Sequence, residues 1–142
     1  ERMTRDLDIL VHEREEAIVI TKMQSADYQI SSRLAIPGIL MLSPAGVEVD
    51  VLFGKYPWLD AALKDVKSDE AGYPTIGLPY LILLKMDAQR AQDWADVSRM
   101  LGWASDADLD AVRAVFQRFS PTDLEDLESL IFIGKKERET PE

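Results

Sequence analysis

The sequence predicts an α/β (α+β) fold, in which a mixed β-sheet with flanking helices is followed by a C-terminal helical segment. Short, alternating or β-branched runs bounded by Pro and Gly fill the first part of the chain, and helical spacing dominates after Pro79. Apolar residues make up 46% and charged residues 30%, which is usual for a globular domain. We expect one domain over residues 1–142, sheet-rich over about 1–55 and helical over about 56–134, with a frayed tail at 135–142.

The first expected element is a buried strand at Leu7–Val11, in which apolar residues alternate with Asp6 and Asp8 at its start. The following segment, Ala17–Tyr28, is ambiguous. Its β-branched beginning suits a strand, whereas the acidic run before it suits the first turn of a helix. We favour the helix.

Two short strands and a hairpin arm are expected next. Val47–Phe53 alternates, so Val47, Val49 and Val51 share one face while Glu48 and Asp50 share the other. Pro and Gly predict a turn directly before this strand. The segments are strands at Tyr28–Arg33 and Gly38–Leu42, a turn at Ser43–Gly46 and the strand at Val47–Phe53.

The second half of the chain predicts helices separated by polar segments. Ser105 is a suitable N-cap, and Pro121 suits the first turn of a helix. The segments are a short helix at Pro57–Leu63, a polar loop at Ser68–Thr75, one long helix at Pro79–Leu101 stopped by Gly102, a helix from Ser105 to about Arg118, and a last helix from Ser120 to about Phe132.

Composition limits the classes of function. The formal charge is 16 − 26 = −10, which argues against broad, non-specific binding of nucleic acid. No run is apolar for long enough to span a membrane, so we expect no membrane partner. The chain has no cysteine, and a reducing cytoplasm is the default location.

Asp6, Asp8 and Asp50 are the candidate chemical groups. Asp6 and Asp8 are two residues apart, so a strand places both carboxylates on one face, where they repel each other unless a cation lies between them. Mg²⁺ or Mn²⁺ prefers oxygen ligands of this kind. Asp50 joins them if its strand pairs near the first, with Glu48 as a competitor on its face. The alternative is a polar strand edge whose acids are only solvated.

The long helix carries a polar stripe with both charges on it, formed by Lys85, Arg90, Asp93 and Asp96. Spacing alone favours ion pairs within the helix. The functional alternative is that Lys85 or Arg90 meets a triphosphate.

Two of these segments resemble bacterial minimal nucleotidyltransferases, of the polymerase-β-like superfamily. Arg2-x-Thr4-x-Asp6-x-Asp8 is similar to the paired-acid strand of that family, and the segment from Lys85 to Val97 is similar to the helix that follows its sheet. Gly46–Leu52 lies between them, where the family places its third acid. The family includes antibiotic-modifying enzymes and members of toxin–antitoxin pairs.

The resemblance implies transfer of a nucleotide from a nucleoside triphosphate to a hydroxyl of a tRNA, a protein or a small molecule. Asp6, Asp8 and Asp50 would be the catalytic, metal-binding acids, with Asp50 as a possible general base. Arg2, Thr4, Lys85 and Arg90 are the candidate substrate-binding residues, and Arg90 could instead brace its helix against the sheet.

One departure from the family pattern separates two hypotheses. The family carries a Gly-Ser or Gly-Gly turn well upstream of its paired acids, and five residues precede Asp6 here, so the resemblance implies an N-terminally truncated member. The first hypothesis is therefore a metal-dependent enzyme. The alternative is a catalytically inactive module with the same fold, such as an antitoxin that acts by protein contact.

Overall fold

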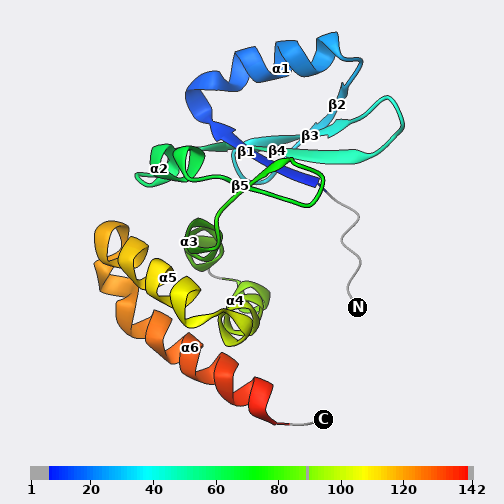
Figure 1. The fold of residues 1–142 in the computed structure, drawn as a ribbon. Helices are drawn as coiled ribbons and strands as arrows, with labels where there is room; N and C mark the ends of the chain where they lie inside the picture. The colour runs from blue at the N-terminus through cyan, green and yellow to red at the C-terminus, as the bar shows by residue number, and fades with distance from the viewer. Residues whose placement is uncertain (1–6, 89, 141–142) are drawn as a thin grey trace. The chain divides into compact units, whose positions relative to one another are not determined.

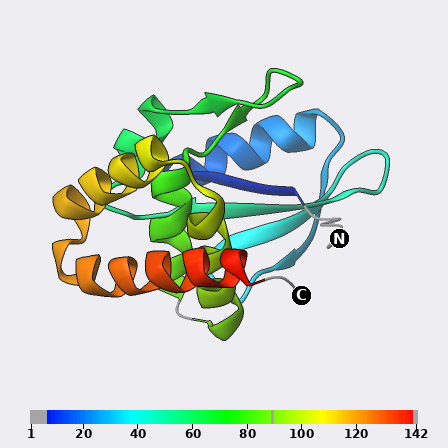
Figure 2. The same cartoon turned by 60° about the horizontal axis from the view of Figure 1, so that its bottom comes forward.

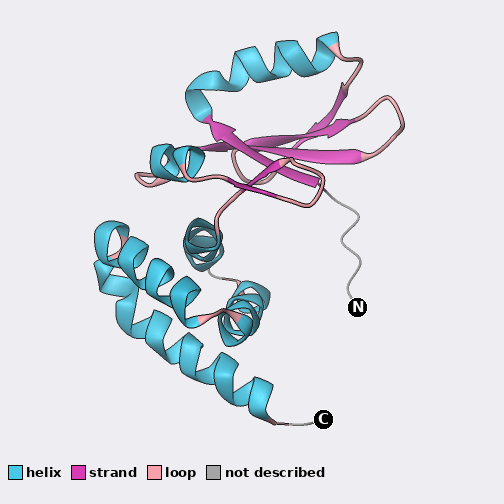
Figure 3. Cartoon of the chain, in the orientation of Figure 1, coloured by secondary structure: helices cyan, strands magenta, loops and turns pink. Residues whose placement is uncertain are grey.

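The computed structural model describes residues 7–88 and 90–140, which fall into two compact units divided between Leu59 and Asp60. The fold is mixed α/β, as expected (Figure 3). The four-stranded sheet belongs to the first unit, and most of the helices belong to the second. Within the described residues, no helix has both the length and the apolar character needed to cross a bilayer.

The first unit is built on a mixed sheet (Figure 1). Strand β1 pairs in parallel with β4, β4 pairs antiparallel with β3, and β3 pairs antiparallel with β2. In the order that they take across the sheet, the strands are β1 (Leu7–His12), β4 (Glu48–Gly54), β3 (Gly38–Leu42) and β2 (Gln29–Arg33).

One face of this sheet forms an apolar core. Val49, Val51 and Phe53 alternate along β4 and are buried together with Ile39 and Met41 of β3. Helix α1 (Glu16–Ser25), which follows the short 3₁₀ helix η1 (Glu13–Glu15), adds partly buried side chains to this cluster and runs along the sheet in Figure 1. The helical reading of the ambiguous segment is therefore confirmed, since tertiary packing outweighs its β-branched start.

The expectation of a buried first strand was wrong. Leu7 of β1 is 56% exposed, Asp8 is exposed, and the other residues of the strand are half-buried. Among the described residues β1 stands at the end of the sheet order, next to β4 alone. A strand in that position buries less of its surface than a central one.

The predicted hairpin arm is confirmed. Ser43 and Gly46 close the turn between β3 and β4 through a hydrogen bond from the Gly46 N–H to the Ser43 carbonyl at 2.9 Å. The Ser43 hydroxyl also accepts from the Val47 N–H at 2.9 Å. Gly46 has φ of 79°, a conformation that glycine adopts without strain.

The second unit is mainly helical. Helix α2 (Leu59–Lys64) begins at the boundary, and two strands of two residues each, β5 (Lys67–Ser68) and β6 (Pro74–Thr75), follow it. In Figure 2 helices α5 and α6 turn back on each other as a helical hairpin. The remaining elements are α3 (Leu78–Ala88), α4 (Ala91–Trp103), α5 (Asp106–Phe119), the 3₁₀ helix η2 (Pro121–Asp123) and α6 (Leu124–Glu139).

The single helix predicted over Pro79–Leu101 was wrong, because the chain forms α3 and α4 with a break between them. Arg90 has extended backbone angles (φ −86°, ψ 146°) at the N-cap of α4. Helix α4 ends at Trp103, one residue after Gly102, so the helix stops close to where it was expected to. A side chain at Gly102 would overlap the backbone of Gly134 in α6, so this glycine serves close helix packing.

Two further expectations were wrong at the ends of elements. The polar loop Ser68–Thr75 includes the small β5–β6 pairing, which Asp69 supports by accepting the Tyr73 N–H at 2.8 Å. The tail at 135–142 was expected to fray, but α6 continues to Glu139. The Arg138 guanidinium donates to the Gly102 carbonyl at 3.4 Å, which ties the last turn of α6 to α4.

Candidate functional site

Asp8 and Asp50 occupy partner positions on adjacent parallel strands. In the pairing of β1 with β4, Asp8 stands opposite Asp50, and Ile9 stands opposite Val51. Side chains at partner positions of neighbouring strands point to the same face, and neighbouring strands run about 4.8 Å apart. The sheet therefore brings together two acids that are 42 positions apart in the sequence (50 − 8 = 42).

The two acids lie on the face opposite the apolar core. Val49 and Val51 flank Asp50 and are buried at 2% and 0% exposure in the cluster that α1 covers. Because side chains alternate along a strand, Asp50 points away from that cluster, as the sequence analysis predicted. Asp8 is exposed and Asp50 is half-buried.

Apolar side chains border the acid pair along the same face. Leu40 of β3 stands opposite Asp50, and Leu10 of β1 stands opposite Leu52 of β4, one alternation further along each strand. Glu48 shares the face of Asp50 but stands opposite Leu42 at the end of β4 and is exposed. The register thus favours Asp50 over Glu48 as the partner of Asp8.

Three of the predicted site residues, Arg2, Thr4 and Asp6, lie outside the described residues. Within residues 7–88 and 90–140, no three His, Asp or Glu side chains come together as a ready-made metal cage. The part of the predicted three-acid site that the structure describes is the pair Asp8 and Asp50.

This pair fits the chemistry of a divalent cation. Two carboxylates at partner positions of neighbouring strands lie close enough to share one bound cation. Mg²⁺ is held in proteins by one or two carboxylates and completes its shell with waters and substrate phosphates. Asp8 and Asp50 would offer two such carboxylates from adjacent strands.

Lys85 takes part in an ion-pair network between α3 and α4. Its Nζ lies 3.4 Å from Asp96 Oδ2 and 3.7 Å from Asp93 Oδ1. In one continuous helix, position 85 would be about 12 Å from position 93 and about 17 Å from position 96 along the axis, so the break at the start of α4 permits both contacts. The sequence analysis expected ion pairs within a single helix, and the pairs of Lys85 instead join two helices.

Arg90 completes this network from the N-cap of α4. Its Nε donates to Asp93 Oδ2 at 2.6 Å and its Nη2 donates to Asp93 Oδ1 at 3.3 Å. The hydrogen bonds to Asp93 raise the pKa of Arg90 above its ordinary value. The Asp93 side chain is only 5% exposed. Lys85 and Arg90 balance the charge of this buried carboxylate. Arg90 thus pairs with an acid of its own helix, and the expected bracing against the sheet stays a prediction.

No protein-family model matches the chain, and no curated protein is detectably similar to it in sequence.

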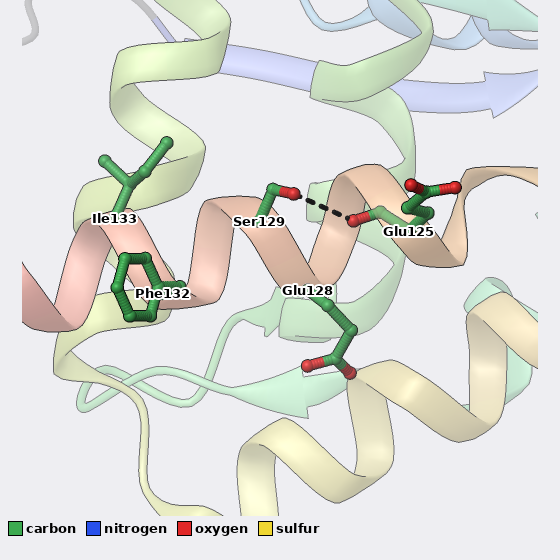
Figure 4. Close-up of a pocket in the computed structure, with 5 residues that line it drawn as sticks. All are labelled: Glu125, Glu128, Ser129, Phe132 and Ile133. Carbon is green, nitrogen blue, oxygen red and sulfur yellow. Dashed lines mark hydrogen bonds between the residues drawn. The ribbon is translucent and has the colours of Figure 1, made fainter.

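One surface feature had no counterpart in the sequence analysis. Phe132 and Ile133 of α6 are 64% and 44% exposed, beside Glu125, Glu128 and Ser129 (Figure 4). The helix was expected to end near Phe132, so the outward stripe that continues to the next turns was not visible. The helical spacing of residues 125–136 is the signal that could have revealed it.

Proposed function

We propose that this chain carries the metal-binding acids of a cytoplasmic nucleotidyltransferase that moves a nucleoside monophosphate from a nucleoside triphosphate to a hydroxyl acceptor. The in-register placement of Asp8 and Asp50 on parallel strands carries the proposal. The resemblance of the Arg2–Asp8 segment to the paired-acid strand supports it. In the proposal, Asp6 joins the pair, and Mg²⁺ or Mn²⁺ is the cofactor.

Each acid has a role that its position suggests. A bound divalent ion would polarise the α-phosphate and offset the charge on the leaving pyrophosphate. Asp8 and Asp50, held by two strands, would fix the position of that ion relative to the sheet. Asp50 is the candidate for accepting the proton of the attacking hydroxyl, since it is half-buried between apolar neighbours while Asp8 is exposed.

The basic residues contribute less to the proposal than the acids do. Lys85 is surrounded by the carboxylates of Asp93 and Asp96, and any contact with a phosphate would compete with them. We therefore assign Lys85 and Arg90 to the positioning of α3 against α4. Phosphate contacts from Arg2 and Thr4 remain part of the proposal through the resemblance.

The proposed reaction requires a hydroxyl group on the acceptor and sets no other condition on it. A tRNA end, a small molecule or a partner protein, as in toxin–antitoxin pairs, each offers one. The formal charge of −10 leaves little positive surface for a long polyanion, so a tRNA would have to be recognised locally.

Label transfer tests the proposal. The full-length protein is incubated with nucleoside triphosphates labelled at the α-phosphate, Mg²⁺ and cell extract. We expect a labelled acceptor with the wild type. Asp8→Asn and Asp50→Asn should each lower the rate by more than about 100-fold, because even residues that only support metal ligands cost 10- to 100-fold.

The matched control is Asp126→Asn, which removes one exposed acid from the surface of α6 and should leave the transfer rate unchanged. Transfer that survives the combined Asp8→Asn and Asp50→Asn variant would rule out the metal-site assignment. A folded wild type that transfers no label to any acceptor would instead favour the binding module.

A further inference from the structure

The outward face of α6 carries a polar and aromatic stripe. Glu125, Ser129, Phe132 and Lys136 follow at intervals of four, three and four residues, which places them on one line along a helix. The opposite side of the helix holds its buried residues, Leu127, Leu130, Ile131 and Gly134. The stripe therefore points directly away from the packing of the second unit.

An apolar centre interrupts this stripe. Phe132 is 64% exposed and Ile133 beside it is 44% exposed. Together with Glu125, Glu128 and Ser129 they form an open surface patch along the helix (Figure 4). An aromatic ring exposed in such a patch is typical of a contact surface.

The two ends of the stripe carry opposite charges. Glu125 lies in the first turn of α6, and Lys136 lies in its last turns. The Lys136 ammonium is 5.8 Å from the centre of the Phe132 ring and 3.6 Å from Glu139 Oε2, so it stays beside the aromatic centre. A helix face with this order of charges is complementary to itself when a second copy runs in the opposite direction.

We propose that α6 docks antiparallel against α6 of a second copy of this chain, with the twofold axis between Ser129 and Phe132. Residues at equal distances from the axis then face each other. Glu125 of each copy faces the Lys136 position of the other, and each Phe132 faces the small Ser129 position. A twofold contact of this kind uses the same patch twice and closes on itself.

The neighbouring charges are compatible with this arrangement. Glu128 turns toward α5, where Arg113 Nε donates to Glu128 Oε1 at 2.6 Å (Figure 4). The Glu128 carboxylate therefore does not cover Phe132 at the centre of the stripe. The 16 residues of α6 extend over about 24 Å. One helix pair of that length makes an interface below the standard size, and we expect dissociation constants of about 10–100 μM.

Sedimentation velocity of the full chain tests the proposal. Between about 5 and 500 μM, the wild type should shift from monomer to dimer. Phe132→Ser should weaken dimerisation by at least about tenfold. A wild type that remains a monomer over this range would overturn the proposal and leave the face to a different partner.

A charge swap separates this arrangement from any other dimer. Glu125→Lys and Lys136→Glu should each prevent self-association, because each variant then presents like charges at both contacts. A mixture of the two variants should form heterodimers, because both contacts again join opposite charges. The double variant should dimerise like the wild type.

The control is Glu70→Lys, which changes the net charge as Glu125→Lys does but lies in the exposed β5–β6 loop. It should leave dimerisation unchanged. Circular dichroism checks that each variant is folded. If the mixture of the two single variants sediments as two separate monomers, or if Glu70→Lys also prevents association, the antiparallel α6 contact is excluded.

Discussion

Arg113 and Glu128 join α5 to α6 through a bidentate pair. Arg113 Nε donates to Glu128 Oε1 at 2.6 Å and Nη2 donates to Oε2 at 3.2 Å. This hydrogen bonding lowers the pKa of Glu128 below its ordinary 4.5, against a smaller opposing effect of burial. The same bonds raise the pKa of Arg113. Both side chains are more than one third exposed, so solvent screens most of the interaction.

The pair predicts a pH dependence of stability. A carboxyl with a lowered folded-state pKa stabilises the protein above its unfolded pKa, and loses that contribution as the pH falls through the folded value. Glu128→Gln should therefore lower the free energy of unfolding by about 0.5 kcal/mol at pH 7. The difference should shrink below pH 4.5.

Urea unfolding of wild type and Glu128→Gln at a series of pH values measures this difference. Glu137→Gln, an exposed acid on the same helix, serves as the control. A difference that grows on acidification would show that the Arg113 contact is not its source.

At the scale of residues, the sequence predicted which face of the sheet a side chain occupies better than which residue stands opposite it. Alternation correctly placed Asp50 on the face opposite Val49 and Val51. The register that sets Asp50 opposite Asp8 could not be read from either segment. It depends on how distant strands pair, which local spacing does not encode.

The packing of α4 on α6 gives the prediction at the scale of elements. A Cβ at Gly134 would overlap the carbonyl oxygen of Ser98 in α4, and rigid backbone cannot move aside as a flexible side chain can. Gly134→Ala should thus lower the free energy of unfolding by at least about 1–3 kcal/mol, the usual cost of overpacking.

The matched control is Gly77→Ala, which is also buried but whose new Cβ would find its nearest neighbour at an ordinary 3.5 Å. It should change the stability much less. Thermal and denaturant unfolding compare the two variants. If both substitutions lower the free energy of unfolding equally, then α4 and α6 can move apart at their crossing without an added cost.

The helix bounds that were predicted wrongly have a common cause, because tertiary contacts set these bounds. Ala88 to Ala91 contains no helix breaker, so sequence spacing joins α3 and α4, while the pairing of Asp93 with Arg90 and Lys85 accompanies the break. The last helix was expected to end near Phe132, but α6 continues through Gly134 to Glu139. In the structure that glycine permits a close crossing. The Ser105 cap was predicted correctly because its signal is local.

For the whole molecule, the order of strands first and helices after was predictable from periodicity. The expected change of character near residues 55–56 lies close to the division between Leu59 and Asp60. The net charge of −10 bears on how the whole molecule could bind a negatively charged substrate. Under the proposed function, a bound cation would reverse the local field for a triphosphate, and Asp8 and Asp50 are the residues proposed to hold it.

Binding of Mn²⁺, followed by electron paramagnetic resonance of the free ion, tests this claim most directly. The wild type should show a saturable site, and Asp8→Asn and Asp50→Asn should each weaken it by at least about tenfold, while Asp126→Asn leaves it unchanged. Binding of equal strength in the wild type and in both site variants would contradict the assignment of Asp8 and Asp50 as metal ligands.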